Sequence, residues 1–166
     1  TVRAVDLAGN FIDDYAAQRL AAALGTTLEV LNLEENRIGS NDGGSGYRAL
    51  SAALATSNVA ELRIGNNALD GFAGFVSALA AAPALRSVFV NSGRFERAGP
   101  RVDWAAHSSH AARDAAKALA ASRPDIAVCY TDKNGRTMYL NAPYAAAAHA
   151  DNTSDDHHLA AVAVAE

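Results

Sequence analysis

The sequence has a single cysteine, Cys129, in 166 residues. One cysteine excludes a disulfide bond within the chain and suits a reducing compartment. Long apolar runs are missing as well, since no stretch approaches the roughly 18 consecutive apolar residues of a membrane-spanning helix. We therefore expect a cytoplasmic protein that has no membrane as a partner.

An excess of positive charge is also missing. The chain has 14 Lys and Arg against 18 Asp and Glu, which gives a formal net charge of −4. Proteins that bind nucleic acids usually carry a basic patch, so we expect no nucleic-acid partner. Half of the residues are apolar. The length is sufficient for one domain with a sizeable core.

The motifs of phosphate binding and nucleophilic catalysis are incomplete. The glycine-rich segment 39–46 (GSNDGGSG) is followed by Tyr47 and Arg48, whereas a phosphate-binding loop needs Lys and then Ser or Thr. We interpret this segment as a flexible contact or a tolerated insertion. Cys129 has no identifiable activating base nearby in the sequence, which argues against a nucleophile.

A metal site has little support. His107 and His110 lie one helical turn apart, but a metal ion needs a further ligand, and the local acids are Asp103 and Asp114. We interpret the run 155–158 (DDHH) as a solvated segment of the tail. We therefore expect no catalytic residue, no metal or other cofactor, and no small-molecule substrate.

What the sequence does contain is one apolar phrase repeated four times. Large apolar residues occupy its first, fourth, sixth and eleventh places, and Asn occupies the ninth place in three copies. The copies are VRAVDLAGNFI (2–12), LEVLNLEENRI (28–38), VAELRIGNNAL (59–69) and LRSVFVNSGRF (85–95). Such a unit cannot bury its apolar face alone, so the repeat predicts a stack of units and favours binding over catalysis.

Each phrase predicts a short strand with one buried face, because apolar and variable residues alternate at its centre. The expected strands are 4–7, 30–33, 61–64 and 87–90. The Asn residues (Asn10, Asn36 and Asn67) are expected to bond neighbouring backbone as the chain turns away, and Gly93 replaces them in the fourth copy.

Helical patterns lie between these strands. The first is capped by Asp13 or Asp14 and ends at Gly25, the second covers about 47–55, and the third stops before Pro83. Further along, Asp103 is a candidate cap for a long helix over 104–122. A last strand is expected at 126–130, and Asn134-Gly135 predicts a hairpin with a returning strand at 137–140.

The phrases LEVLNLEENRI and VAELRIGNNAL resemble those of leucine-rich-repeat proteins of the ribonuclease-inhibitor type. The resemblance implies an α/β solenoid shaped as a horseshoe, with a parallel inner sheet, outer helices and a C-terminal cap of one helix and a hairpin. The expected domains are about four repeats over 1–97, the cap over 98–142 and a tail over 143–166.

In this family, the variable residues of the strands line the concave face. The resemblance thus implies a central row of Asp6, Asn32, Arg63 and Phe89, with Ala127 as its candidate last member. A flanking row would hold Ala8, Glu34, Gly65, Asn91 and Cys129, with Glu35 and Glu61 close by. The expected protein-binding residues are Asp6, Asn32, Glu34, Glu35, Glu61, Arg63, Phe89 and Asn91. An alternative is that these are ordinary solvated residues, with Arg63 paired to Glu34 or Glu61.

The resemblance implies a non-enzymatic interaction or scaffold module within a larger assembly, such as a cytoskeletal or ciliary axoneme complex. An alternative is a regulator of a small GTPase, because the Ran GTPase-activating protein has the same repeat type. A third is a sensor repeat of an immune receptor. The sequence opens with Thr1 inside a repeat strand. We therefore expect a segment of a longer protein, or a subunit whose first repeat a partner covers.

Overall fold

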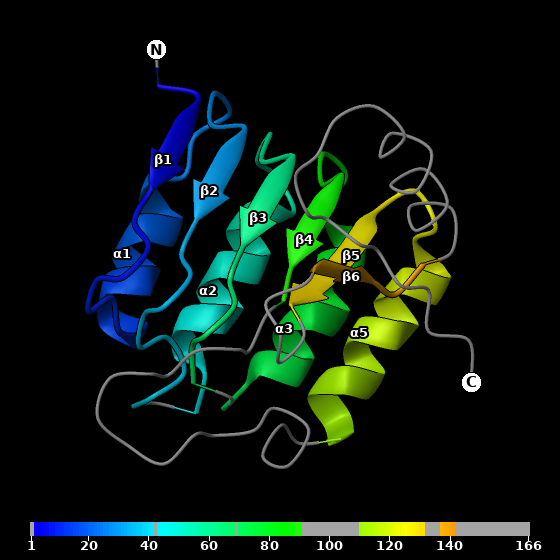
Figure 1. Ribbon diagram of the computed structural model, residues 1–166. Coiled ribbons are helices and arrows are strands. Elements are labelled where there is room, and N and C mark those ends of the chain that lie inside the picture. The colour runs from blue at the N-terminus through cyan, green and yellow to red at the C-terminus, as the bar shows by residue number, and fades with distance from the viewer. Residues whose placement is uncertain (1, 42, 69, 91–109, 132–136, 142–166) are drawn as a thin grey trace, which may run out of the picture.

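The computed structural model describes residues 2–41, 43–68, 70–90, 110–131 and 137–141 (Figure 1). Six strands form one sheet in the order β1-β2-β3-β4-β5-β6. The strands are β1 (Ala4–Asp6), β2 (Val30–Asn32), β3 (Glu61–Arg63), β4 (Ser87–Phe89), β5 (Ala127–Thr131) and β6 (Thr137–Tyr139). The first five are parallel, and β6 returns antiparallel to β5.

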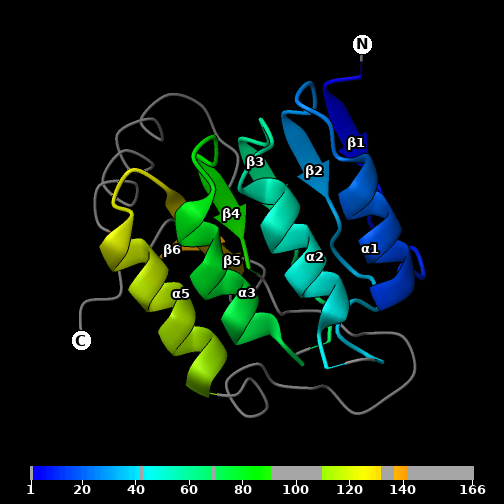
Figure 2. The same cartoon turned by 180° about the vertical axis from the view of Figure 1, so that it is seen from behind.

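The described helices all lie on one face of this sheet, and none of them lies on the opposite face, as the two opposite views show (Figures 1 and 2). They are α1 (Asp14–Ala23), α2 (Ser45–Leu54), α3 (Phe72–Ala78) and α5 (His110–Ser122), and the 3-10 helix η1 (Leu79–Ala81) extends α3. This arrangement follows from right-handed strand–helix–strand connections between parallel strands. The structure is therefore α/β with a mostly parallel sheet, as expected.

The core lies between the sheet and the helices. The central residue of each inner strand points into it, because side chains alternate along a strand. Leu31, Leu62, Val88 and Val128 occupy matching register positions and are fully buried. Tyr47 of α2 packs against Phe72 and Phe75 of α3, with ring centroids 5.5 and 5.0 Å away. The Tyr47 hydroxyl donates to the carbonyl of Ala68 at 2.9 Å.

Asn36 and Asn67 each tie their own repeat to the one before it. The Asn36 amide donates to the carbonyls of Leu33 and Glu34 in its own repeat and to that of Leu7 in the first repeat, at 2.9–3.1 Å. Its oxygen accepts from the Ile12 N–H. Asn67 repeats this pattern one unit later, with Leu33 and Ile38 as its partners in the second repeat. The expected backbone bonding of these side chains is confirmed.

The glycine-rich segment 39–46, interpreted above as a flexible contact or a tolerated insertion, is hydrogen-bonded to α1 at three of its residues. The Asp14 carboxylate is buried and accepts backbone N–H groups from Gly39, Asn41 and Gly46 at 2.9–3.1 Å. A carboxylate that is satisfied in this way holds the loop against α1. Asp13, not Asp14, caps α1, and its carboxylate accepts from the Ala16 N–H.

The other side of the loop touches the next repeat. Gly44 and Gly71 precede α2 and α3 with φ of 78° and 79°, a left-handed conformation that favours glycine. A Cβ atom on Gly44 would lie 2.7 Å from the Cα atom of Gly71. The two loops therefore pack backbone against backbone, which leaves no room for a side chain at Gly44.

The expected first four strands agree with the structure to within one residue, and the three helical patterns correspond to α1, α2 and α3 with η1. The last strand and its returning partner are confirmed as β5 and β6. The expected long helix is confirmed from His110 onward. Asp103, Trp104, the Asn134-Gly135 turn and the tail over 143–166 lie outside the described residues. Of the helices described, none has the length and apolarity that a membrane crossing requires.

Candidate functional site: the helix-free face of the sheet

Two rows of side chains line the sheet face opposite the helices, which we call the helix-free face. The strand pairings align Asp6, Asn32, Arg63, Phe89 and Cys129 in the first row. The second row holds Ala4, Val30, Glu61, Ser87 and Ala127. The expected central row is thus confirmed for its first four members, but Cys129 and not Ala127 continues it. The reason is the register of β5, which sets Ala127 opposite Ser87.

Arg63 lies at the centre of this face and contacts side chains of both neighbouring repeats. Its Nε donates to Glu61 Oε1 at 3.0 Å, and its Nη1 lies 3.8 Å from Glu34 Oε2. Its guanidinium carbon lies 4.4 Å from the centroid of the Phe89 ring, in a cation–π contact. The side chain keeps 40% of its surface exposed. The expected pairing of Arg63 holds for both carboxylates, so Arg63 is held in place and still accessible.

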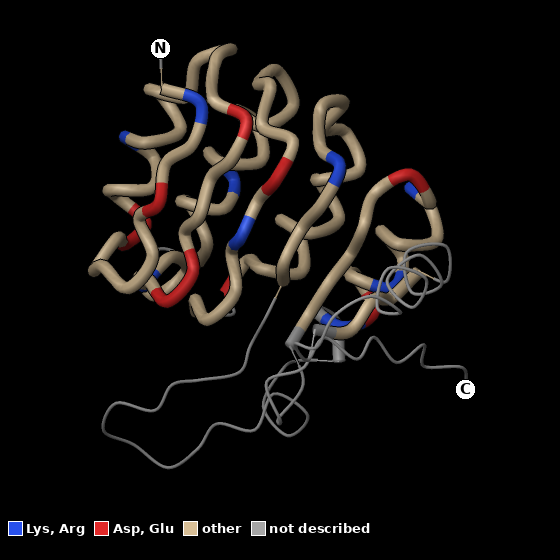
Figure 3. The backbone as a smooth tube through the Cα atoms, turned by 45° about the horizontal axis from the view of Figure 1, so that its top comes forward, with Lys and Arg blue, Asp and Glu red and all other residues tan. Residues whose placement is uncertain are grey.

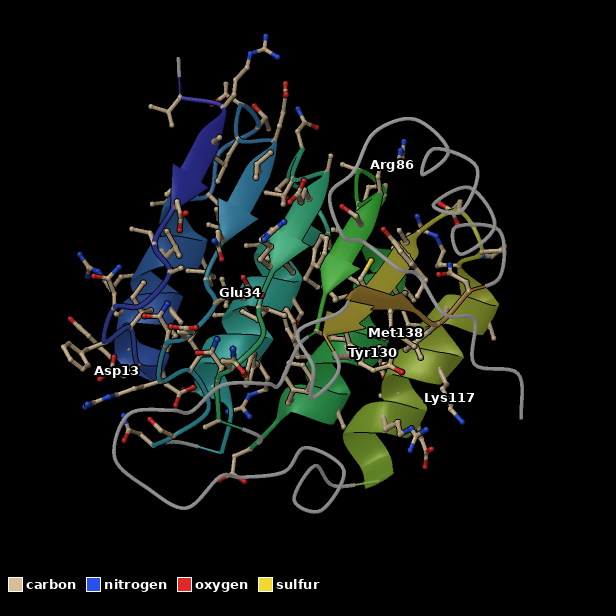
Figure 4. All side chains as sticks on the ribbon, in the orientation of Figure 1. Asp13, Glu34, Arg86, Lys117, Tyr130 and Met138 are labelled. Atoms are coloured by element: carbon tan, nitrogen blue, oxygen red, sulfur yellow. The ribbon has the colours of Figure 1, made fainter. Side chains whose placement is uncertain are left out.

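Acidic residues gather on this face near the carboxyl ends of β1 and β2. Glu34 lies just beyond the carboxyl end of β2 (Figure 4). Burial raises the pKa of its carboxyl, Arg63 partly opposes this shift, and the charges of Glu35 and Asp6 add to it. Glu35 is exposed and has a left-handed backbone, with φ of 57°. The tube in Figure 3 shows basic and acidic segments next to each other on β3, where Glu61 and Arg63 lie.

The side chains of Asp6 and Asn32 each accept a hydrogen bond from the backbone of the turn that follows their strand. The Asp6 carboxylate accepts from the Ala8 N–H at 2.9 Å, and the Asn32 side-chain oxygen accepts from the Glu34 N–H at 3.1 Å. These bonds fix the turn after each strand, as local side-chain acceptors commonly do. Both residues therefore shape the edge of the helix-free face as well as line it.

Cys129 follows Phe89 in the first row and pairs with Tyr139 of β6. Its thiol is buried, and burial raises its pKa to about 12, against a smaller lowering by Arg63. A thiol that stays protonated at neutral pH is a poor nucleophile. Sγ lies 3.7 Å from the Ala127 carbonyl oxygen, as a weak donor.

No family model matches the chain, and no curated protein or solved structure was found to be similar.

Some residues that the sequence singles out lie outside the part of the chain that the structure describes. Asn91, which was expected to line the helix-free face, is one of them, and so are His107 and the tail acids and histidines. Among the described residues, no three His, Cys, Asp or Glu side chains gather as a metal site would require. Ser87, which sequence reasoning missed, lies between Glu61 and Ala127 in the second row. Counting two residues back from Phe89 would have found it.

Proposed function

We propose that this chain is a non-enzymatic protein-interaction and scaffold module that binds its partner through the helix-free face. The observation that carries the proposal is the Arg63–Phe89 pair at the centre of this face. Arginine and aromatic side chains are the usual anchors of protein interfaces, above all where they lie centrally and are packed. Glu34, Glu35 and Asp6 lie on one side of the pair and offer acceptors for polar contacts around it.

The face is suited to binding because it is rigid before a partner arrives. The Arg63 side chain is fixed by Glu61 and by the Phe89 ring, and the strands below it are locked by the bonds of Asn36 and Asn67. A side chain that is ordered beforehand loses less conformational entropy on association. This preorganisation gives the pair more value as an anchor than two mobile side chains would have.

In its finer form, the proposal takes the four strand–helix units as leucine-rich repeats of the ribonuclease-inhibitor type, with the helix-free face as the inside of a horseshoe. Parallel pairing in constant register and the recurring asparagine bonds support it. The partners would be other proteins of a cytoplasmic multi-subunit complex, such as a cytoskeletal or ciliary axoneme assembly. That setting rests on the resemblance of the repeat phrases.

The test is partner capture by matched variants. Arg63→Glu combined with Phe89→Ala removes both anchors, while Arg19→Glu reverses a charge on the exposed side of α1 as the control. We expect proteins that the wild-type chain captures from a cell extract to be retained by the control and lost by the double variant, at unchanged melting temperature. Equal capture by all three chains would contradict the proposed interface.

A separate assay addresses the GTPase-regulator alternative. GTP hydrolysis by a panel of small GTPases is measured with and without the chain. We expect no stimulation. Stimulated hydrolysis that the double variant retains would replace the scaffold proposal with the regulator.

A further inference from the structure

One residue of every strand lies in the first row of the helix-free face. The row continues to β6, because Cys129 pairs with Tyr139 and paired residues of neighbouring strands point to the same side. In order from β1 to β6, the members are Asp6, Asn32, Arg63, Phe89, Cys129 and Tyr139. The row begins with a carboxylate and has aromatic side chains toward its other end, so the two ends of the face differ in chemistry.

The end of the face at β1 and β2 holds more negative charge than Arg63 compensates. Asp6 and Glu35 are exposed there, and Glu34 is partly exposed. Arg63 donates to Glu61 but approaches Glu34 only to 3.8 Å. Burial raises the pKa of the Glu34 carboxyl, and the charges of Glu35 and Asp6 raise it further. These carboxylates therefore still repel one another, and a further cation among them would reduce that repulsion.

The end of the face at β4 to β6 presents aromatic side chains. Phe89 and Tyr139 are partly exposed and lie on either side of Cys129, which is buried. The Arg63 guanidinium lies over the Phe89 ring and holds it in place. Among the described residues of β4 to β6, no charged side chain lies in either row. Aromatic rings that are held in this way are suited to pack against an apolar side chain of a partner.

The distance between the two ends matches an extended chain. Neighbouring strands lie about 4.8 Å apart, so the three strand spacings from Asp6 to Phe89 cover about 14 Å. An extended segment rises about 3.4 Å per residue and spans this distance in about four residues. Side chains four residues apart in such a segment point to the same side. One segment that crosses the strands can therefore contact both ends.

We propose that the partner contributes an extended segment that crosses the strands, with a Lys or Arg at the β1–β2 end and an apolar side chain about four residues away at the β4–β6 end. The basic group lies between Asp6 and Glu34, and the apolar side chain lies between Phe89 and Tyr139. This inference rests on the proposed function and specifies its partner. Charge complementarity decides the sign, because an acidic segment would add to the repulsion among the carboxylates.

The experiment selects ligands for the full chain from a phage-displayed library of random linear peptides. Selected peptides are synthesised, and their affinities are measured by fluorescence anisotropy. The variant D6N/E34Q removes two negative charges and keeps side-chain oxygens, so that the Ala8 N–H retains its acceptor. The matched control is D70N/D114N, which removes two charges at exposed positions outside the two rows. The Arg63→Glu and Phe89→Ala double variant is the chain without its central anchors.

We expect the selected peptides to share a Lys or Arg and an apolar residue about four positions apart. Affinity should fall about tenfold in D6N/E34Q and stay unchanged in the control, at equal melting temperature. Replacing the shared basic residue of the peptide by Ala should weaken binding to the wild-type chain about tenfold and binding to D6N/E34Q much less. Tyr139→Ala should also weaken binding, because it removes one side of the apolar contact.

Three outcomes would overturn the inference. Peptides that lack the basic residue, yet bind the wild-type chain and not the double variant, would overturn it and leave the proposed function intact. A selection that yields no peptide lost by the double variant would overturn it too, while the capture test decides the proposed function separately. Basic peptides that bind an R94Q/R97Q/R101Q variant but not the wild-type chain would show that the chain's own segment, and not a partner, occupies the face.

Discussion

Asp14 shows how one side chain can organise a whole loop. Its buried carboxylate accepts three backbone N–H groups from the glycine-rich segment that precedes α2. Gly46 comes close enough that a Cβ atom there would lie 2.8 Å from Asp14 Oδ1. Gly46 therefore serves a close approach to a carboxylate of the protein itself, whereas the glycines of a phosphate-binding loop approach a ligand.

Asp14→Ala should destabilise the chain by about 3 kcal/mol, because buried N–H groups that lose a charged acceptor bear the full cost of desolvation. Urea unfolding followed by circular dichroism measures the loss. Asp13→Ala is the matched control, since Asp13 only caps α1, and it should cost about 1 kcal/mol. Equal losses in the two variants would contradict the role given to Asp14.

The Cys129 thiol should be unreactive in the folded chain. Its pKa of about 12 leaves little thiolate at pH 8, and its burial restricts access. A colorimetric disulfide reagent should label it in native buffer only as fast as the chain opens, and at once in urea. Rapid labelling in native buffer would show that the thiol is accessible and ionised.

At the scale of the element, the strands are too short to be stable by pairing alone. Each of β1 to β4 has three residues, and one central side chain per strand enters the core. The outward side chains add contacts between neighbouring repeats, above all those of Arg63 with Glu34 and Phe89. Cross-strand pairs of this kind typically contribute about 0.2–1 kcal/mol each. The same side chains thus support the sheet and form its candidate binding face.

Glu34 gives these strands a pH dependence. Its pKa in the folded chain lies above the ordinary value of 4.5, so the folded state holds this proton more tightly than the unfolded state. The contribution of Glu34 to stability is therefore favourable below that value and is lost as the pH rises through the raised pKa.

Glu34→Gln should consequently raise the urea midpoint, relative to the wild-type chain, more at pH 7 than at pH 4. Glu35→Gln, at the exposed neighbouring position, is the control and should give a smaller change between the two pH values. A Glu34→Gln variant that is less stable than wild type at pH 7 would show that the attraction to Arg63 outweighs burial.

At the scale of the whole molecule, stability depends on contacts between successive repeats. Asn36 is buried and bonds two repeats, whereas Asn10 is exposed and bonds only its own turn among the described residues. A stack of this kind is stabilised by the sum of its units and their interfaces. The cooperativity of unfolding therefore depends on the contact that Asn36 makes between the first and second repeats.

Asn36→Ala should lower the free energy of unfolding by about 3 kcal/mol, since it leaves buried backbone groups unpaired. Asn10→Ala, the equivalent change in the first repeat, should cost about 1 kcal/mol or less because water replaces its partners. Urea unfolding with circular dichroism compares the two. Equal costs would contradict the assignment of Asn36 as the tie between repeats.

Much of the fold could be predicted because its signals are local. The alternation around Leu31 and Leu62 places these strands to within a residue, and Asp13 marks the start of α1. The candidate site was predictable only in part. Asp6, Asn32, Arg63 and Phe89 share a row because equal phrases stack in register, but no phrase precedes β5, so the place of Cys129 in that row could not be counted.

The sequence by itself determined the α/β alternation, the buried face of each strand and helix, and the repeat that sets them in register, since these depend on the spacing of residues near one another in the chain. Only the tertiary structure decided that the Asp14 carboxylate holds the loop at 39–46, that Arg63 lies between Glu34 and Phe89, and that Cys129 follows Phe89 in their row. The physical reason is that these contacts join separate repeats, where the pairing of strands and the path of the connecting loops set the distances between side chains.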